Sequence, residues 1–163
     1  MKKLTKSELL KYGENIVFAL GCAFILTSFF SIVMQRLDVA VFQLVSTSEG
    51  KFDKSFIYAC VFAPIFEEII FRWIPITFLM LMMGKKFENV KWHIAALLAI
   101  VFGAAHYGYF SIYIQGVFGF FVTYVYYNNR KYMYLSGVIM HMAWNFTLYY
   151  TLPTMINFPK SIW

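Results

Sequence analysis

Long apolar runs fill most of this 163-residue chain and restrict its fold more than any other feature. Hydrophobic residues make up 61% of the sequence and charged residues 13%, which is more apolar side chain than a soluble domain of this length can cover. A helix needs about 20 apolar residues to cross a bilayer, so the length leaves room for about five spans. We therefore predict an all-α polytopic transmembrane helix bundle, a single membrane domain over residues 1–163, with helices over residues 16–34, 56–83, 94–105, 109–127 and 132–152.

The second run, residues 56–83, is too long for one straight membrane helix. At 1.5 Å per residue it would measure about 42 Å, against about 30 Å of hydrocarbon. Pro75 lies inside this run, and an interior proline removes one backbone hydrogen bond, so we expect a kink or break near Pro75. In the fourth run, Gly116 and Gly119 allow a close approach of helices, and Pro153 is expected to end the last helix.

Lysine and arginine gather at the ends of the apolar runs and divide unevenly between the two sides of the predicted bundle. The side that holds the N-terminus carries nine of them, and the other side carries four. Because cytoplasmic loops carry the excess of Lys and Arg, we predict a multi-pass cell-membrane protein with a cytoplasmic N-terminus. The same placement explains the net charge of +6 without a nucleic-acid partner. Cys22 and Cys60 both lie in apolar runs, which predicts small buried hydrophobes rather than a disulfide or a metal cluster.

Three ionisable residues interrupt the second run, where charge is least expected. Glu67, Glu68 and Arg72 lie between apolar stretches on both sides, and an ionisable group at the bilayer centre costs about 2.5 to 3.5 kcal/mol on insertion scales. Glu68 and Arg72 are spaced i, i+4, which predicts an ion pair on the helix surface. Glu67 remains as a candidate general base. The alternative is a structural ion network that holds the helices together.

Two histidines and an asparagine are the other strongly polar residues that this pattern singles out. His106 lies at the C-terminal end of the third run, and His141 and Asn145 are spaced i, i+4 on one face of the last helix. Each alone is also typical of a hydrogen bond between helices. Together with Glu67 they comprise a carboxylate base, two imidazoles and an amide donor, which are the groups needed to activate water and stabilise an oxyanion.

The order and spacing of these residues resemble the three-motif signature of a known family, the CPBP family of CAAX proteases and bacteriocin-processing membrane proteins, also called Abi. The motifs as they stand here are Glu67-Glu68-x-x-x-Arg72, Phe102-x-x-x-His106 and His141-x-x-x-Asn145. The resemblance implies an intramembrane glutamate-type protease fold with a catalytic core of about residues 55–152. It implies that Glu67 activates water, that His106, His141 and Asn145 complete the catalytic site, and that Glu68, Arg72 and Phe102 support it.

The resemblance also implies a function, a membrane endopeptidase that hydrolyses a peptide or a lipidated, membrane-associated protein without a metal or other cofactor. The family includes eukaryotic enzymes that trim prenylated CAAX proteins and bacterial proteins linked to peptide maturation or bacteriocin self-immunity. Because this chain is shorter than is usual for the prenyl-protein proteases, we expect the bacterial type.

Other functions remain open at this point. The first alternative is a non-catalytic immunity or scaffold protein of the same fold, which binds a toxin or a membrane partner. The second is a zinc-dependent CAAX-type metalloprotease with Glu67, His106 and His141 as ligands, although the sequence contains no H-E-x-x-H motif. A channel or transporter would need a pair of broken or repeated segments, and only one proline-interrupted run is visible.

Overall fold

The computed structural model describes residues 5–36, 54–106 and 112–156, and each element in these segments is a helix. The predicted all-α class is therefore confirmed. The elements are α1 Lys6–Arg36, α2 Lys54–Ile57, η1 Tyr58–Phe62, α3 Ala63–Glu68, η2 Ile69–Trp73, α4 Ile74–Met83, η3 Gly84–Lys86, α5 Phe87–Ala105, η4 Ile112–Gly116, α6 Val117–Asn128, η5 Arg130–Tyr132 and α7 Met133–Ile156.

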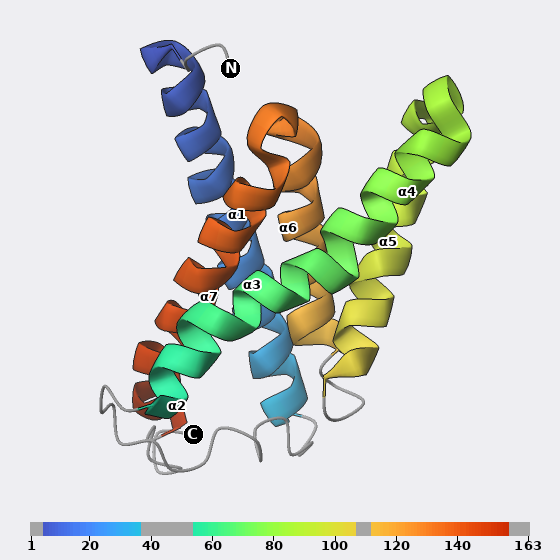
Figure 1. Ribbon diagram of the computed structural model, residues 1–163. Helices are drawn as coiled ribbons and strands as arrows, with labels where there is room; N and C mark the ends of the chain where they lie inside the picture. Colours follow the sequence, from blue (N-terminus) through green and yellow to red (C-terminus); the bar gives the residue numbers. More distant parts are fainter. Residues whose placement is uncertain (1–4, 37–53, 107–111, 157–163) are drawn as a thin grey trace.

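The helices run up and down the molecule in chain order. Figure 1 shows the N-terminal end of α1, the turn between α4 and α5, and the turn between α6 and α7 at one end of the bundle. The elements from α2 to α4 follow one another as a single oblique rod, which we call the rod, residues 54–83. One buried cluster draws side chains from α1, α4, α5, α6 and α7, and its ring stack of Phe118 on Trp144 has a centroid distance of 4.8 Å.

The predicted kink or break near Pro75 is not confirmed, because the backbone stays helical from η2 into α4. The distortion lies just before the proline, in the π-helical turn Ile69–Trp73. A second π turn, Tyr58–Phe62, precedes Pro64 by the same two residues. A proline donates no hydrogen bond and its ring crowds the carbonyl four residues back, so the preceding turn widens instead of breaking. The bend of the rod at Pro75 stays a prediction.

Three helix boundaries differ from those predicted from the apolar runs. α1 begins at Lys6 and α5 at Phe87, well before their apolar stretches, because each helix continues as an amphipathic segment. In α5, Phe87 is buried while Glu88 and Lys91 form an exposed i, i+3 ion pair of 3.1 Å. α7 continues to Ile156, so the prediction that Pro153 ends it is wrong. One lost hydrogen bond does not force a helix to stop. Most of the segment between the first two apolar runs, residues 35–54, lies outside the described residues.

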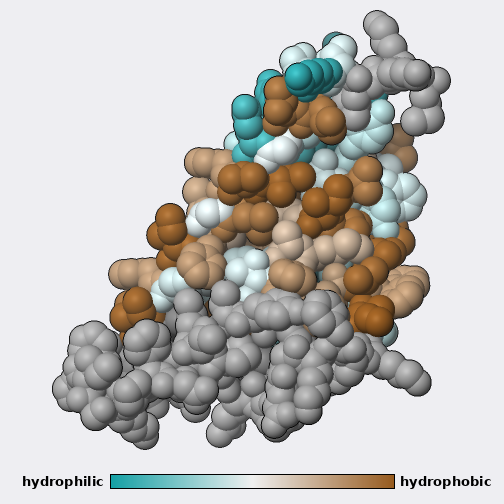
Figure 2. All heavy atoms as spheres, turned by 90° about the vertical axis from the view of Figure 1, so that its left-hand side faces the viewer, coloured by the Kyte–Doolittle hydropathy of each residue, from teal (hydrophilic) through white to brown (hydrophobic). Residues whose placement is uncertain are grey.

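The surface of the molecule is largely apolar. Figure 2 shows hydrophilic surface gathered toward one end and a broad hydrophobic surface below it. Large side chains such as Leu81 and Val17 are 79% and 71% exposed, and in water so many exposed apolar groups would cause association. By length and hydropathy, one helix of the described residues qualifies as a membrane span, residues 6–30. The predicted number of five spans is therefore not confirmed.

Glycines permit the closest contacts between helices, as predicted for Gly116. A Cβ on Gly116 would lie 3.1 Å from the carbonyl oxygen of Ala99, and one on Gly103 would lie 2.6 Å from the Cα of Ile112. These two glycines let η4 pack directly on the backbone of α5, which fixes the C-terminal end of α5 against the start of α6.

Replacing Gly137 by alanine is expected to destabilise the fold. A Cβ there would lie 2.0 Å from Cε2 of the buried Tyr126 ring, and overpacking of this kind costs about 1 to 3 kcal/mol, which exceeds the helix-propensity gain of about 1 kcal/mol. The matched control is Gly21→Ala in α1, where nothing lies within 4 Å of the added Cβ. Thermal unfolding in detergent micelles compares the two variants, and equal melting temperatures would contradict the tight packing at Gly137.

Candidate active site

The predicted site residues come from three parts of the fold that meet inside the bundle. Glu67 and Glu68 are the last residues of α3, and Arg72 follows in η2. Phe102 lies in the last turn of α5, and His106 caps that helix with an extended backbone. His141 and Asn145 lie one turn apart in α7.

Glu67 lies between the two histidines. Its Oε2 is 3.7 Å from Nε2 of His106 and 3.6 Å from Nε2 of His141. These distances allow charge attraction but are longer than a hydrogen bond, as catalytic contacts often are before substrate binds. Glu67 and His106 are each 28% exposed, so both groups are reachable from outside the protein.

Glu68 forms the centre of a buried charge network. Its Oε1 accepts a hydrogen bond of 2.6 Å from Nη1 of Arg72 and lies 2.7 Å from Nδ1 of His141. All three side chains are at most 2% exposed. The predicted Glu68–Arg72 ion pair is thus present. His141 contacts the same carboxylate, which the sequence spacing did not predict. A buried charge is stable only when paired in this way.

The network gives His141 a defined orientation. An ionised Glu68 can only accept a hydrogen bond, so Nδ1 of His141 carries a proton and Nε2 is the nitrogen that faces Glu67. His141 therefore connects the buried carboxylate of Glu68 to the accessible carboxylate of Glu67. The His106 ring is held separately, because its Nδ1 lies 2.7 Å from the carbonyl oxygen of Phe102.

Arg72 is enclosed by an aromatic ring and a glycine. Its Cζ lies 3.8 Å above the centroid of the Phe102 ring, a cation–π contact. A Cβ on Gly119 would lie 2.6 Å from Nη2 of Arg72, so the glycine predicted to allow close packing makes room for the guanidinium itself. Among the described residues, Nε and Nη2 of Arg72 have no hydrogen-bond partner, and Glu68 Oε2 has none. The guanidinium is thus packed between the Phe102 ring and Gly119.

Asn145 donates its amide to the rod. Its Nδ2 lies 2.8 Å from the carbonyl oxygen of Ala59, which sits in the first π turn. In a π turn the carbonyl oxygen of Ala59 would accept a hydrogen bond from the residue five positions later, but that residue is Pro64, which has no N–H. The N–H of Ala63, which would bond to Ala59 in an α-helix, bonds to the carbonyl oxygen of Tyr58 instead. Asn145 therefore satisfies a carbonyl that the proline leaves open. Its predicted role as an oxyanion donor stays a prediction.

Aromatic residues of α6 and α7 complete the surroundings of the site, and no sequence pattern predicts them. The Tyr126 hydroxyl donates to the carbonyl oxygen of Glu68 at 3.4 Å, and the Tyr134 hydroxyl donates to that of Ile65 at 3.1 Å. Phe118 packs edge-on against His141 with a centroid distance of 4.9 Å. Aromatic residues form 21% of the chain and lie throughout its apolar runs, so no spacing distinguishes these three.

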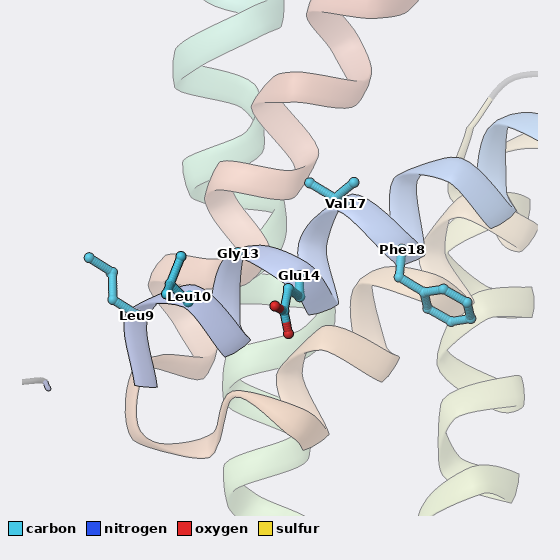
Figure 3. A pocket seen from close by; sticks show the side chains of 6 residues that line it. All are labelled: Leu9, Leu10, Gly13, Glu14, Val17 and Phe18. Carbon is cyan, nitrogen blue, oxygen red and sulfur yellow. The ribbon is translucent and has the colours of Figure 1, made fainter. Parts of the chain in front are cut away.

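The surface hollow of Figure 3 lies elsewhere. Its lining consists of residues of α1 alone, and none of the predicted site residues contributes to it. Among residues 5–36, 54–106 and 112–156, no group of three or more His, Cys, Asp or Glu side chains is arranged to hold a metal ion. A zinc-dependent mechanism stays an alternative for the chelator experiment given below.

Comparison with protein families identifies the segment that contains the site. Residues 54–147 match the Rce1-like family, described as type II CAAX prenyl endopeptidase Rce1-like, and this segment includes every residue from Glu67 to Asn145. No curated protein and no solved structure matches the chain. Since the family match covers more than half of the residues and agrees with the three motifs, this protein belongs to the Rce1-like family of membrane-embedded CAAX-type proteases.

Proposed function

We propose that this protein is an intramembrane endopeptidase in which Glu67 activates a water molecule for attack on a peptide bond. One observation carries the proposal: the accessible Glu67 carboxylate faces Nε2 of both His106 and His141, and His141 is oriented by a buried Glu68–Arg72 pair. A general base held by oriented imidazoles is the arrangement that hydrolysis by water requires.

In the proposed reaction Glu67 first accepts a proton and later donates it, while His106, His141 and Asn145 position and stabilise the reacting groups. Glu67 takes a proton from water as the oxygen bonds to the carbonyl carbon of the substrate, and the carbonyl oxygen becomes an oxyanion. His141, doubly protonated between the carboxylates of Glu68 and Glu67, donates a hydrogen bond from Nε2 to this oxyanion, and Asn145 contributes the second N–H of its amide. The carbon–nitrogen bond then breaks, and the proton on Glu67 passes to the leaving amine. His106 holds Glu67 and the water in line.

The proposed setting is the cell membrane, with several helices across the bilayer and the N-terminal end of α1 in the cytoplasm. The apolar surface of Figure 2 and the alternating direction of the helices in Figure 1 support a multi-pass arrangement. The substrate is a peptide or a membrane-associated protein, and we favour bacterial peptide maturation or bacteriocin self-immunity. A prenylated CAAX protein, the substrate that the family description names, is the second candidate.

Peptide cleavage by the purified protein in detergent tests this function. We expect mass spectrometry to detect cleavage of a library of apolar peptides, and we expect the rate to be unchanged by 1,10-phenanthroline. Loss of cleavage with the chelator, restored by zinc, would establish the metalloprotease alternative. If no peptide is cleaved, and protection against a bacteriocin survives substitution of both Glu67 and His141, the protein is a non-catalytic immunity protein.

A further inference from the structure

Long contacts at the Glu67 carboxylate leave its position to the backbone that carries it. Its Oε2 is 3.7 Å from Nε2 of His106 and 3.6 Å from Nε2 of His141, and neither distance is that of a hydrogen bond. Charge attraction across such gaps changes little over a few tenths of an ångström, so it does not fix the carboxylate. The position of Glu67 therefore depends on the last turn of α3, residues 65–68.

The last turn of α3 is weakly held by the hydrogen bonds of its own helix. Pro64, one residue before it, has no N–H to donate. After it the π turn Ile69–Trp73 begins, and the N–H of Ile69 is shared between the carbonyl oxygens of Ile65 and Phe66. Each acceptor of a shared bond is held less firmly, and a carbonyl oxygen with two lone pairs can take a second donor.

Two tyrosine hydroxyls from other helices supply hydrogen bonds to this turn. The Tyr134 hydroxyl of α7 donates to the carbonyl oxygen of Ile65 at 3.1 Å, and the Tyr126 hydroxyl of α6 donates to that of Glu68 at 3.4 Å. Tyr134 makes the shorter bond, and its ring also meets the Trp73 ring at a centroid distance of 6.4 Å. Tyr134 thus contacts the rod both before and after the two glutamates.

Tyr134 shares one face of α7 with two of the predicted site residues. His141 and Asn145 follow it after seven and eleven positions, and at about 100° per residue all three lie within about 40° of one another. Each of the three side chains contacts the rod, in order at Ile65, Glu68 and Ala59. One helix therefore carries both an imidazole that faces Glu67 and the hydroxyl that bonds to the turn of Glu67.

We propose that Tyr134 is a positioning residue, which holds the last turn of α3 so that the Glu67 carboxylate stays between the two imidazoles. The hydroxyl bonds to a backbone carbonyl and takes no part in proton transfer. Without it, the Ile65 carbonyl keeps only its shared bond from Ile69, and the carboxylate shifts relative to His141. A misplacement of about 1 Å can cost about a hundredfold in rate. This role rests on the proposed function, because Glu67 is the base of that reaction.

Removing the hydroxyl alone, in Tyr134→Phe, tests this role against a matched control. Tyr127→Phe removes a hydroxyl that donates to the carbonyl oxygen of Lys91 at 3.0 Å, near the start of α5. We expect both variants to lose a similar amount of thermal stability in micelles, since each loses one hydrogen bond to a helix carbonyl. We expect kcat for peptide hydrolysis to fall about tenfold in Tyr134→Phe, with KM unchanged, and to stay at the wild-type value in Tyr127→Phe.

Thiol labelling tests the same role without catalysis. Glu67→Cys is made in a Cys22→Ala, Cys60→Ala background, and its rate of reaction with a small maleimide is measured in detergent. Residue 67 is partly exposed, so its labelling depends on how often the turn opens. We expect the addition of Tyr134→Phe to raise the rate about threefold or more, because local opening becomes more frequent, and the addition of Tyr127→Phe to leave it unchanged.

Equal kcat values in Tyr134→Phe and Tyr127→Phe would overturn the inference, and so would a labelling rate that Tyr134→Phe does not change. If the wild-type protein cleaves no peptide, the proposed function fails, and the labelling rates alone then show whether Tyr134 holds the turn. The two failures are therefore distinguishable.

Discussion

Replacing Glu67 by glutamine is expected to lower kcat for peptide hydrolysis about a thousandfold, within the range of about 10² to 10⁴ that a positioned general base contributes. The amide keeps the size of the side chain but cannot take a proton from water. Because the side chain is accessible and its contacts to both imidazoles exceed 3.5 Å, its replacement leaves the buried network intact. We expect KM to change little, and product formation followed by mass spectrometry measures both constants.

The matched control is Glu14→Gln, an exposed carboxylate in α1 that lies in the hollow of Figure 3. This variant is expected to retain the wild-type kcat, since it removes the same charge from a part of the protein surface outside the candidate site. If Glu67→Gln cleaves peptides at the rate of this control, Glu67 is not the base and the proposed mechanism fails.

Replacing Arg72 by methionine is expected to be the most destabilising substitution of the site. It leaves the Glu68 carboxylate at zero exposure without its 2.6 Å partner, and removing one member of a buried ion pair costs about 3 to 5 kcal/mol. Methionine still fills space over the Phe102 ring, so the loss is mainly electrostatic. We expect the free energy of unfolding to fall by about 3 kcal/mol, the low end of this range, because His141 still contacts Glu68. Urea unfolding in micelles measures this loss.

A second substitution identifies the cause of this loss. In the double variant Glu68→Gln, Arg72→Met no charge remains to be compensated, so we expect it to be more stable than Arg72→Met alone. The double-mutant cycle then gives a coupling energy between Glu68 and Arg72. A double variant no more stable than Arg72→Met would show that the guanidinium acts through packing against Gly119 and Phe102 instead.

The sequence was sufficient to predict the helices and the meeting of the motif residues. Long apolar runs leave little choice of secondary structure in a membrane, and charges that cost this much energy have to find partners. The pairing of Glu68 with Arg72 followed from a spacing of four residues within one helix. The contact of His141 with the same carboxylate joins residues 73 positions apart, which no local rule predicts.

Other features could not be predicted, for identifiable reasons. The early starts of α1 and α5 could not be predicted because the first turns of both helices contain polar residues, which are typical of loops. A proline in an apolar run predicts that a backbone hydrogen bond of the helix is lost. Tertiary packing decides whether the helix breaks there or forms a wider π turn. The bond from Asn145 to Ala59 depends on that outcome, because the acceptor exists only where the wide turn meets Pro64.

The two wide turns also change the phase of the rod. In an α-helix each residue advances by about 100°, and a π turn includes one residue more per hydrogen-bonded ring. Residues beyond Trp73 are therefore rotated by about one residue step relative to those before Ile69. A helical wheel drawn through the whole rod would place Glu67 and Ile76 on wrong relative faces. Deletion of a single residue within Ile69–Trp73 would therefore rotate the two parts of the rod relative to each other. It would turn the glutamates away from the histidines, although both glutamates and both histidines would still be present.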